Sequence, residues 1–371
     1  MSKCQGEREG LLSRRGFVGG AVGVAAAVGV AGEALAKPKK KKKGEDASAE
    51  APGAGPQSWA AQPPAGFVPY SAPGRVIKVA KSNTLQPNQL WPTEDAARVM
   101  LARLMSEFTG EQDLGKAFGK FVHPADKVAI KVNGIAAQKG ATMGSNKELI
   151  LEIVKGVLAA GVPAANIYVF EQYPSFLSGT RISDKVLPAG VKSYTHNTQD
   201  AVMPEIRVSG VNTRFCRQLT DCTAVINVPL IKDHSITGYT GALKNMTHGC
   251  VLNPQAFHAM GGSPYIPLLY AQDVIKSRVR LHITDGYKLI YNGGPLDKDK
   301  NARIPHEALY ISTDPVAQDI VGWQLLDKIR TDKGMPTFKK AKREPTYIRI
   351  AGDLGLGIAD QNQITFREVA L

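Results

Sequence analysis

The apolar residues of the chain follow two periodicities that alternate between residues 71 and 371. Short runs rich in Val, Ile and Phe are typical of strands, and longer segments with apolar residues three or four positions apart are typical of amphipathic helices. Strand, helix and strand alternate in this way in a parallel sheet covered by helices. The pattern therefore predicts an α/β fold with a mixed, mainly parallel sheet flanked by helices, built as one domain or as two lobes.

Individual elements follow from the same patterns. Strands are predicted at residues 76–80, 127–132, 167–171, 206–209, 224–229, 279–284 and 308–312. Helices are predicted after the N-cap Thr93 and at residues 146–160, 266–278 and 315–331. The last helix has the strongest start signal, because Asp314 is a good N-cap residue and Pro315 suits the first helical position.

Reactive side chains are most concentrated between Asn227 and Gly249, in the segment N-V-P-L-I-K-D-H-S-I-T-G-Y-T-G-A-L-K-N-M-T-H-G. An apolar, β-rich run ends at Ile231 and is followed directly by Lys232 and His234. Glycines then interrupt the chain on both sides of a second lysine, and glycine lets the backbone approach a ligand closely. Because α/β sheets bind ligands at the carboxyl ends of strands, we expect the functional site here.

This segment allows three interpretations. The first is a surface helix after a glycine-rich turn, in which Lys244 has no special role. The second is an anion-binding loop, although the spacing does not match G-x-x-x-x-G-K-[ST]. The third is a catalytic loop in which His234 is an acid or base and Lys244 is a charge or a covalent tether. We combine the last two, with His234, Lys244 and Lys232 as catalytic residues and with Asn227, Gly238, Tyr239, Thr240, Gly241 and Asn245 as ligand-binding residues.

Two carboxylates outside the segment are added to the predicted site. Asp285 follows a predicted strand and would emerge at the same edge of the sheet as His234, either as a catalytic group or as part of a turn. Asp319 lies one turn into the last predicted helix among apolar neighbours, where an unpaired carboxylate is costly. We expect a lysine of the glycine-rich segment to pair with Asp319, and we include Asp319 among the ligand-binding residues.

Three nearby residues have side chains that bind transition metals. His248, Cys250 and His258 lie within eleven residues of one another, and imidazole and thiolate are ligands for such ions. Their spacing matches no established metal-binding motif, so structural roles remain open for all three. A cofactor containing nickel or another transition metal is therefore one hypothesis, with His258 as its first ligand.

Three stretches resemble one bacterial and archaeal family, the domain-of-unknown-function family three-six-two. They are N-V-P-L-I-K-D-H, G-Y-T-G-A-L-K-N and D-P-V-A-Q-D at residues 314–319, within a likeness that extends from about Val76 to the C-terminus. The strand before Asn133 also resembles the family pattern V-K-P-N, with Val132 in place of the proline. The resemblance implies a domain of this size and a site near these stretches, and it implies no particular reaction.

A shorter pattern, H-x-x-x-G-Y-x-G-x-x-K from His234 to Lys244, is similar to a stretch of the nickel-pincer lactate racemases. That similarity implies an acid/base role for His234, a cofactor tether at Lys244 and a nickel ligand near His258. The second acid/base histidine of those enzymes has no counterpart, because the strand at residues 167–171 is followed by Q-Y-P-S. Lactate racemase activity is therefore not expected.

The N-terminal part of the chain predicts export. Residues 13–18 read S-R-R-G-F-V, a twin-arginine pattern, and a weakly apolar run and A-L-A follow, which predicts a cleaved signal peptide at residues 1–36. Residues 37–70 begin with a lysine run and continue with Pro, Ala and Gly, which predicts a disordered linker. We expect export to the periplasm by the twin-arginine translocase, no stable transmembrane span, and a folded domain at residues 71–371.

Charge and cysteine content limit the partners. The formal net charge is +13, but residues 1–43 hold ten Lys or Arg against three Glu, so the remaining chain is only mildly basic. No nucleic-acid-binding motif is present, and we expect no nucleic-acid partner. Cys216 and Cys222 are expected either to form a disulfide or to remain buried thiols.

Two functional hypotheses follow. In the first, the protein is an exported enzyme of the isomerase or oxidoreductase type that binds a small carboxylate on its lysines. His234 then moves a proton at the adjacent carbon, alone or with a metal or pincer-like cofactor near His258. In the second, a periplasmic protein uses the same site to hold a ligand or an iron–sulfur partner without catalysis.

Overall fold

The computed structural model describes residues 58–137, 142–196 and 205–371. The predicted signal peptide and the first part of the predicted linker lie outside these residues. Residues 58–70, predicted as the end of the linker, instead contact the domain. The backbone N–H of Tyr70 donates to the carbonyl of Lys120 at 2.8 Å, and the guanidinium of Arg278 donates to the carbonyl of Trp59 at 2.7 Å. The folded part of the chain therefore begins before residue 71.

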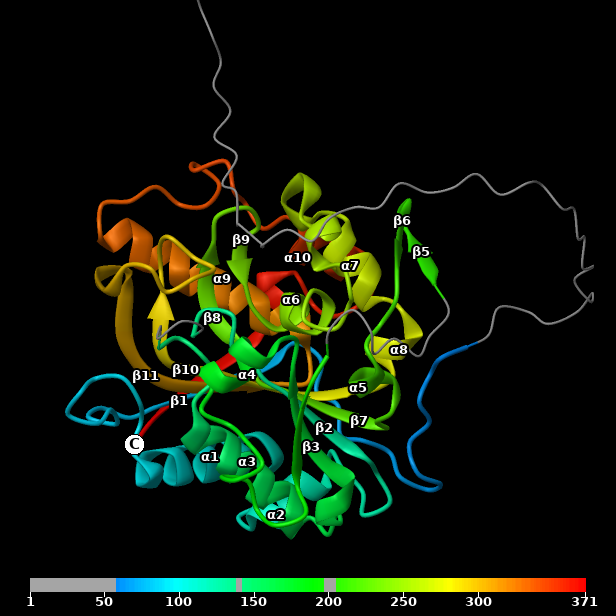
Figure 1. The fold of residues 1–371 in the computed structure, drawn as a ribbon. Coiled ribbons are helices and arrows are strands. Elements are labelled where there is room, and N and C mark those ends of the chain that lie inside the picture. The colour runs from blue at the N-terminus through cyan, green and yellow to red at the C-terminus, as the bar shows by residue number, and fades with distance from the viewer. Residues whose placement is uncertain (1–57, 138–141, 197–204) are drawn as a thin grey trace, which may run out of the picture. The chain divides into compact units, whose positions relative to one another are not determined.

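A mixed, mainly parallel sheet runs through the domain (Figure 1). Its strands, in spatial order, are β12 (Thr365–Ala370), β1 (Arg75–Ala80), β11 (Arg303–Ser312), β10 (Val279–Ile290), β7 (Ala224–Asn227), β2 (Val128–Lys131), β3 (Ile167–Glu171) and β4 (Lys192–Thr195). β8 (Leu230–His234) pairs with β10 and with β9 (Gly238–Thr240), and β5 (Ile206–Val208) pairs with β6 (Val211–Thr213) in a separate hairpin. The strands from β10 through β7, β2 and β3 to β4 are all parallel. The predicted fold class is confirmed.

Helices cover both faces of this sheet (Figure 1). One face carries α1 (Glu94–Thr109), α2 (Leu114–Gly119) and α3 (Lys147–Ala159), and the other carries α6 (Ala242–Thr247), α7 (Tyr265–Tyr270), α9 (Pro315–Asp332) and α10 (Tyr347–Asp353). Three shorter helices are α4 (Pro174–Gly179), α5 (Arg217–Thr220) and α8 (Asp273–Lys276). Alternate strand residues point to the two faces, so Ile130 joins one apolar core and Ala129 the other. Of the helices that the structure describes, none combines the length and apolar character needed to cross a bilayer.

Local signals in the sequence are confirmed where a side chain caps a helix. The Thr93 hydroxyl accepts a hydrogen bond from the backbone N–H of Ala96 at 3.1 Å, at the start of α1. One carboxylate oxygen of Asp314 accepts from Val316 and Ala317, both at 2.9 Å, at the start of α9. Such bonds satisfy the first N–H groups of a helix, which have no partner within it. Asp314 is therefore a structural cap.

The apolar run at residues 224–231 does not form one strand. Pro229, which has no N–H to donate, lies between β7 and β8. As a result, the chain leaves β7 and pairs again in β8, beside β10 and β9. Lys232 and His234 therefore lie inside a strand rather than beyond its end, and both project from the same face of that strand.

Two further elements differ from their predictions. β10 continues beyond Thr284 to Ile290, with a register shift after Gly286, so Asp285 lies inside a strand and not at its carboxyl end. A bulge of this kind lets a strand continue past an irregular residue, which the run of apolar residues alone does not reveal. The helix predicted at residues 266–278 is divided into α7 and α8. The three cysteines in the described residues are buried free thiols, with no disulfide between Cys216 and Cys222.

A buried ion pair connects β10 to the segment before β2, and it predicts a large effect on stability. Arg280 makes two hydrogen bonds to the Asp126 carboxylate, at 2.6 and 3.0 Å, and both side chains are nearly inaccessible. Replacing Asp126 by Ala leaves the guanidinium without its counter-charge, so Asp126→Ala should lower the free energy of unfolding by about 3–5 kcal/mol. Urea-induced unfolding measures this loss.

The control for this prediction is Asp332, which pairs with Lys328 on the exposed surface of α9. Solvent screens that pair, so Asp332→Ala should change the free energy of unfolding by less than about 1 kcal/mol. Equal losses for the two variants would show that burial does not strengthen the Arg280–Asp126 pair.

Candidate functional site

The carboxyl ends of three adjacent parallel strands bring polar side chains to one edge of the sheet. β2 ends at Lys131, β3 ends at Glu171 and β7 ends at Asn227, and the register places Lys131 opposite Asn227. Asn133 follows β2 at the same edge. Ligands bind at this edge in open α/β sheets, because the loops that leave the strands surround it.

A cavity of about 220 Å³ opens at this edge. Seven predicted site residues line it, namely Lys232, His234, Thr240, Lys244 and Asn245 together with the predicted metal ligands His248 and His258. Tyr173, Phe176 and Pro295 supply apolar parts of the wall. The structure therefore brings together, around one small space, side chains from β8, β9, α6 and the segment that follows α6.

Sequence analysis did not select Lys131, Asn133 or Glu171, although Asn133 and Glu171 also line the cavity. The signal was present, because three predicted strands end in the polar stretches K-V-N, E-Q and N-V. These polar stretches point to one common site only when the strand order is known, because that order places β7, β2 and β3 side by side.

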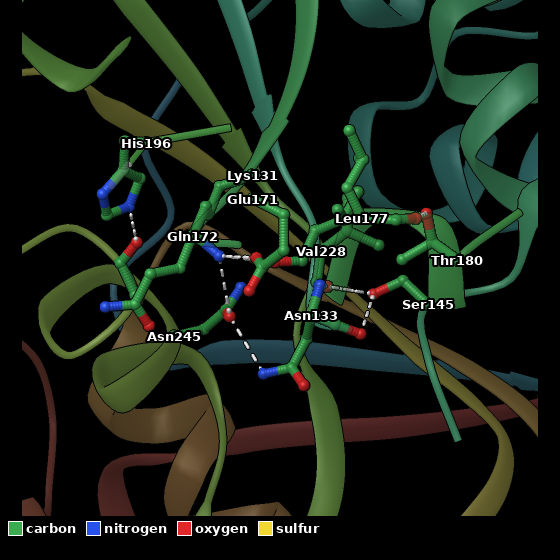
Figure 2. A network of polar contacts seen from close by, with 12 residues as sticks. Lys131, Asn133, Ser145, Glu171, Gln172, Leu177, Thr180, His196, Val228 and Asn245 are labelled. Atoms are coloured by element: carbon green, nitrogen blue, oxygen red, sulfur yellow. Dashed lines mark hydrogen bonds and ion pairs between the residues drawn. The ribbon is translucent and has the colours of Figure 1, made fainter. Parts of the chain in front are cut away.

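Lys131 and Glu171 form a buried ion pair at the cavity (Figure 2). The Lys131 ammonium also donates to the carbonyl of Val132 at 2.6 Å and lies 3.5 Å from Oδ1 of Asn245. Gly249 permits this arrangement, since a Cβ at that position would lie 2.9 Å from Nζ of Lys131. Glu171, the one carboxylate among the described residues that line the cavity, is therefore already neutralised by a lysine.

A chain of side-chain hydrogen bonds connects Lys232 to the interior (Figure 2 shows its central members, Asn133 and Asn245). Lys232 donates to Oδ1 of Asn133 at 2.8 Å, Asn133 donates to Oδ1 of Asn245 at 3.0 Å, and Asn245 donates to Oδ1 of Asn227 at 2.7 Å. Asn227 then donates to Nδ1 of His282 at 3.0 Å. Burial lowers the pKa of His282 to about 3, so this imidazole is neutral and its Nδ1 accepts. Each amide thus has one orientation, and Asn133 presents oxygen to Lys232.

His234 is held as a hydrogen-bond donor toward the cavity. Its Nδ1 accepts from the backbone N–H groups of Ile236 and Thr237, at 3.2 and 3.3 Å, so the ring proton lies on Nε2. Burial, followed by the positive charge of Lys244, strongly lowers the pKa of His234, and the ring stays neutral. This hydrogen-bonding pattern differs from the predicted role of His234 as the group that moves a proton, because Nε2 has no free lone pair.

His258 has the opposite arrangement. Its Nδ1 donates to the carbonyl of Pro254 at 3.0 Å, so Nε2 is the acceptor, and Nε2 lies 3.3 Å from Nζ of Lys244. Burial and the neighbouring Lys244 lower the pKa of His258 to about 4. The ring is stacked on that of His234, with centroids 5.3 Å apart. Near neutral pH, His258 therefore holds the Lys244 amine in place as a neutral hydrogen-bond acceptor.

Lys232 and Lys244 have no carboxylate partner among the residues that the structure describes. Burial lowers the pKa of Lys244 to about 7, and burial together with the charge of Lys244 lowers the pKa of Lys232 well below its usual value. Two further polar atoms in the wall, Oγ1 of Thr240 and Nε2 of His248, are buried without a hydrogen-bond partner in the described part of the chain. A hydroxyl without an acceptor and lysines without a counter-ion suit a small anion, which brings its own acceptors.

Both predicted carboxylates lie away from the cavity and have structural partners. Asp285 accepts from the backbone N–H of Asn146 at 2.6 Å and from the amide of the same residue, which fixes the start of α3. Asp319 does not pair with a lysine. Its two oxygens accept from the backbone N–H groups of Ala242 and Leu243, at 2.6 and 3.0 Å, and so hold the first turn of α6.

The glycines of the segment serve contacts within the chain rather than contacts to a ligand. Gly238 has φ of +74° and lies against the carbonyl of Arg343, and a Cβ at Gly241 would collide with the Asp319 carboxylate. Tyr239 is buried, and its carbonyl accepts from the hydroxyl of Tyr347 at 3.0 Å. The predicted ligand-binding roles of Gly238, Tyr239 and Gly241 therefore have no support from their positions.

The three predicted metal ligands do not converge. The rings of His248 and His258 are 4.5 Å apart, but Cys250 does not line the cavity, and its carbonyl accepts from the backbone N–H of Cys216. Across the described ranges, no group of three or more His, Cys, Asp or Glu side chains is placed to hold a metal ion. The prediction of a site formed by these three residues is corrected on this ground.

Comparisons with other proteins give a family match and two distant structures. A family model described as "Domain of unknown function (DUF362)" matches residues 128–324, more than half of the chain. A Thermotoga maritima protein solved by a structural genomics consortium has 13% identity and a TM-score of 0.40, over 65% of this chain and 59% of that one. The lactate racemase apoprotein from Thermoanaerobacterium thermosaccharolyticum has 12% identity and a TM-score of 0.39, over 68% of this chain and 57% of that one. The chain thus spans less than two thirds of the length of either structure, and no curated protein matches it.

The contact between Asp319 and α6 predicts that this buried carboxylate stabilises the helix that carries Lys244 and Asn245. Asp319→Asn replaces one of the two accepting oxygens by an NH₂ group, which would face a backbone N–H. The variant should lose about 1–3 kcal/mol of unfolding free energy in urea. Asp360→Asn is the control, because Asp360 caps an exposed turn through one oxygen and asparagine caps equally well. If both variants are as stable as the unmodified protein, Asp319 does not hold α6.

Proposed function

The chain belongs to the DUF362 family, whose description names no reaction, and from this premise we propose that it is an exported enzyme that binds a small carboxylate and transfers a proton at a carbon close to that group. One observation carries the proposal: two buried lysines, Lys232 and Lys244, line the cavity, and the one carboxylate among its described lining residues, Glu171, already pairs with a third lysine, Lys131. Positive charge that lacks a counter-ion within the protein favours an anionic ligand.

Lys244 is assigned both binding and proton transfer, while Thr240 and His234 each have one role in the wall. The carboxylate of the ligand would be held by Lys244 in its ammonium form and by the hydroxyl of Thr240, which has no partner in the described part of the chain. The Nε2–H group of His234 would donate to an oxygen on which negative charge develops when a nearby C–H bond is broken. Because the side chains that make these interactions are buried, the interactions are stronger than they would be in water.

Lys244 is the group best suited to carry the proton. A general base works most efficiently when its pKa is close to the pH at which it acts, and the pKa of Lys244 is lowered to about 7 by burial. His258 Nε2 accepts from the amine at 3.3 Å and keeps it at the cavity. This assignment replaces His234, the residue first expected to move the proton.

In this mechanism, side chains of the protein carry out every step. A metal or organometallic cofactor would have to bring most of its own ligands, because no group of three or more His, Cys, Asp or Glu side chains in the described ranges is placed to hold a metal ion. Export through the twin-arginine translocase to the periplasm is proposed on the S-R-R-G-F-V pattern at residues 13–18.

Replacing Lys244 tests the site and separates an enzyme from a binding protein. Pyruvate, malonate and lactate should be screened for an increase in melting temperature, and Lys244→Ala should abolish the increase, whereas the exposed-residue control Lys328→Ala should retain it. In D₂O, proton NMR should show exchange of C–H groups of a bound carboxylate with solvent, and Lys244→Ala should stop that exchange. Binding without exchange for every ligand would favour a non-catalytic binding protein, and a Lys244→Ala variant with unchanged binding would remove the site assignment.

The pKa of Lys244 predicts that carboxylate binding weakens as the pH rises through about 7. Below this pH Lys244 is an ammonium ion and attracts the anion, and above it the amine is neutral, so the dissociation constant should rise by up to about tenfold per pH unit. Titration calorimetry with the ligand identified above measures the dependence. Lys244→Arg is the matched variant, since a guanidinium stays charged over this range and should remove the dependence. A dependence that persists in Lys244→Arg must come from another group.

A further inference from the structure

Lys232 has surroundings that are rare for a lysine side chain. It is fully buried in the cavity wall and lies on the same face of β8 as His234, because residues two apart on a strand point the same way. Its nitrogen has one acceptor, Oδ1 of Asn133, at 2.8 Å. Glu171, whose charge acts on Lys232, is bound to Lys131, and no carboxylate within the described ranges forms an ion pair with Lys232.

These surroundings favour the neutral amine over the ammonium ion. Burial lowers the pKa of Lys232 well below its usual value, and the positive charges of Lys244 and Lys131 lower it further. A neutral amine that donates one N–H to Asn133 still has a nitrogen lone pair, which an ammonium ion lacks. A buried lysine with a free lone pair is the group that attacks carbonyl compounds in proteins.

We propose that Lys232 forms an imine with the carbonyl carbon of a small 2-oxo acid bound in the cavity. The inference rests on the proposed function, because it adds a carbonyl group to the small carboxylate already assigned to this site. Lys232 makes the covalent bond, while Lys244 gives and takes protons. His234 donates its Nε2–H to the carbonyl oxygen, which helps that oxygen to accept negative charge.

The atoms of this step balance without an external reagent. The Lys232 lone pair forms a C–N bond as the π electrons of the carbonyl move to oxygen, and the oxygen receives a proton from the attacking nitrogen. Lys244 in its ammonium form then protonates the hydroxyl group, which leaves as water while the nitrogen lone pair forms the C=N⁺ bond. The products are a protonated imine, one water molecule and a neutral Lys244 amine.

The imine removes a difficulty from the proposed proton transfer. A carbanion next to a carboxylate is costly, because both groups are negative. A positively charged C=N⁺ group instead accepts the electron pair of the neighbouring C–H bond and gives a neutral enamine. The neutral Lys244 amine produced in the preceding step takes this proton. His258 holds the Lys244 nitrogen near the site. One lysine therefore serves as acid and then as base.

Reductive trapping tests the proposal with the full-length protein and pyruvate as the probe. Sodium borohydride reduces an imine to a stable secondary amine, so the peptide that contains Lys232 should carry a 1-carboxyethyl group by mass spectrometry. Lys288 is an internal control, because it is also buried, with its pKa lowered to about 8, but donates to the carbonyl of Thr142 at 2.9 Å outside the cavity. Lys288 should remain unmodified in the same sample.

Two variants decide the identity of the nucleophile. Lys232→Arg should lose the adduct, and its melting temperature shows whether it is folded. Lys244→Arg should carry any adduct at Lys232.

An adduct on Lys244 or Lys288 overturns the proposal, as does the lack of any adduct in unmodified protein. If pyruvate raises the melting temperature without forming an adduct, the imine is overturned alone and the proposed function stands. If pyruvate neither stabilises the protein nor forms an adduct, and no other carboxylate binds, both are overturned.

Discussion

The site depends on an imbalance of charge. Lys232 and Lys244 line one cavity with Lys131 behind its wall, and the described residues that line the cavity supply a single carboxylate, Glu171, to offset them. Because a buried charge without a partner is costly, the protein must either release protons from the remaining amines or accept an anion from outside. Both outcomes come from the same arrangement. A second carboxylate in the wall would remove them together and leave an ordinary network of ion pairs.

The fold creates this imbalance by sorting charges between the faces of one strand. Residues of β8 alternate, so Lys232 faces the cavity while Asp233 faces away and accepts from the Arg343 guanidinium at 2.8 Å. The carboxylate nearest in sequence to the site lysine is therefore unavailable to it. β3 and the segment after β2 add Glu171 and Asn133 to the wall, because the carboxyl ends of these parallel strands share an edge. Apolar cores on both faces of the sheet hold these ends in register.

Local signals were predictable from the sequence, and contacts between distant elements were not. The periodicity gave the fold class and most strands, and Asp314 was recognisable as a cap because its partners are the next residues. Lys232 and Lys244 could be placed together because one short segment carries both. Asn133 could not be placed beside them from the sequence, because it reaches Lys232 only through the order of the strands in the sheet. A lysine partner is predicted for Asp319 because a buried carboxylate needs hydrogen-bond donors. The sequence does not reveal that backbone N–H groups of α6 are those donors.

The series of three asparagines behind Lys232 has a direction, since every amide gives a proton to the next residue and receives one from the previous. Turning one amide over would bring like atoms face to face, so all must turn together or none. The last member, His282, sets the direction by offering a lone pair. The carbonyl of Ala242, which also accepts from the Asn227 amide at 3.0 Å, fixes the same direction. Two acceptors remote from solvent, His282 and the Ala242 carbonyl, thus determine that Asn133 presents its oxygen to Lys232, which leaves the lone pair of a neutral amine free at the cavity.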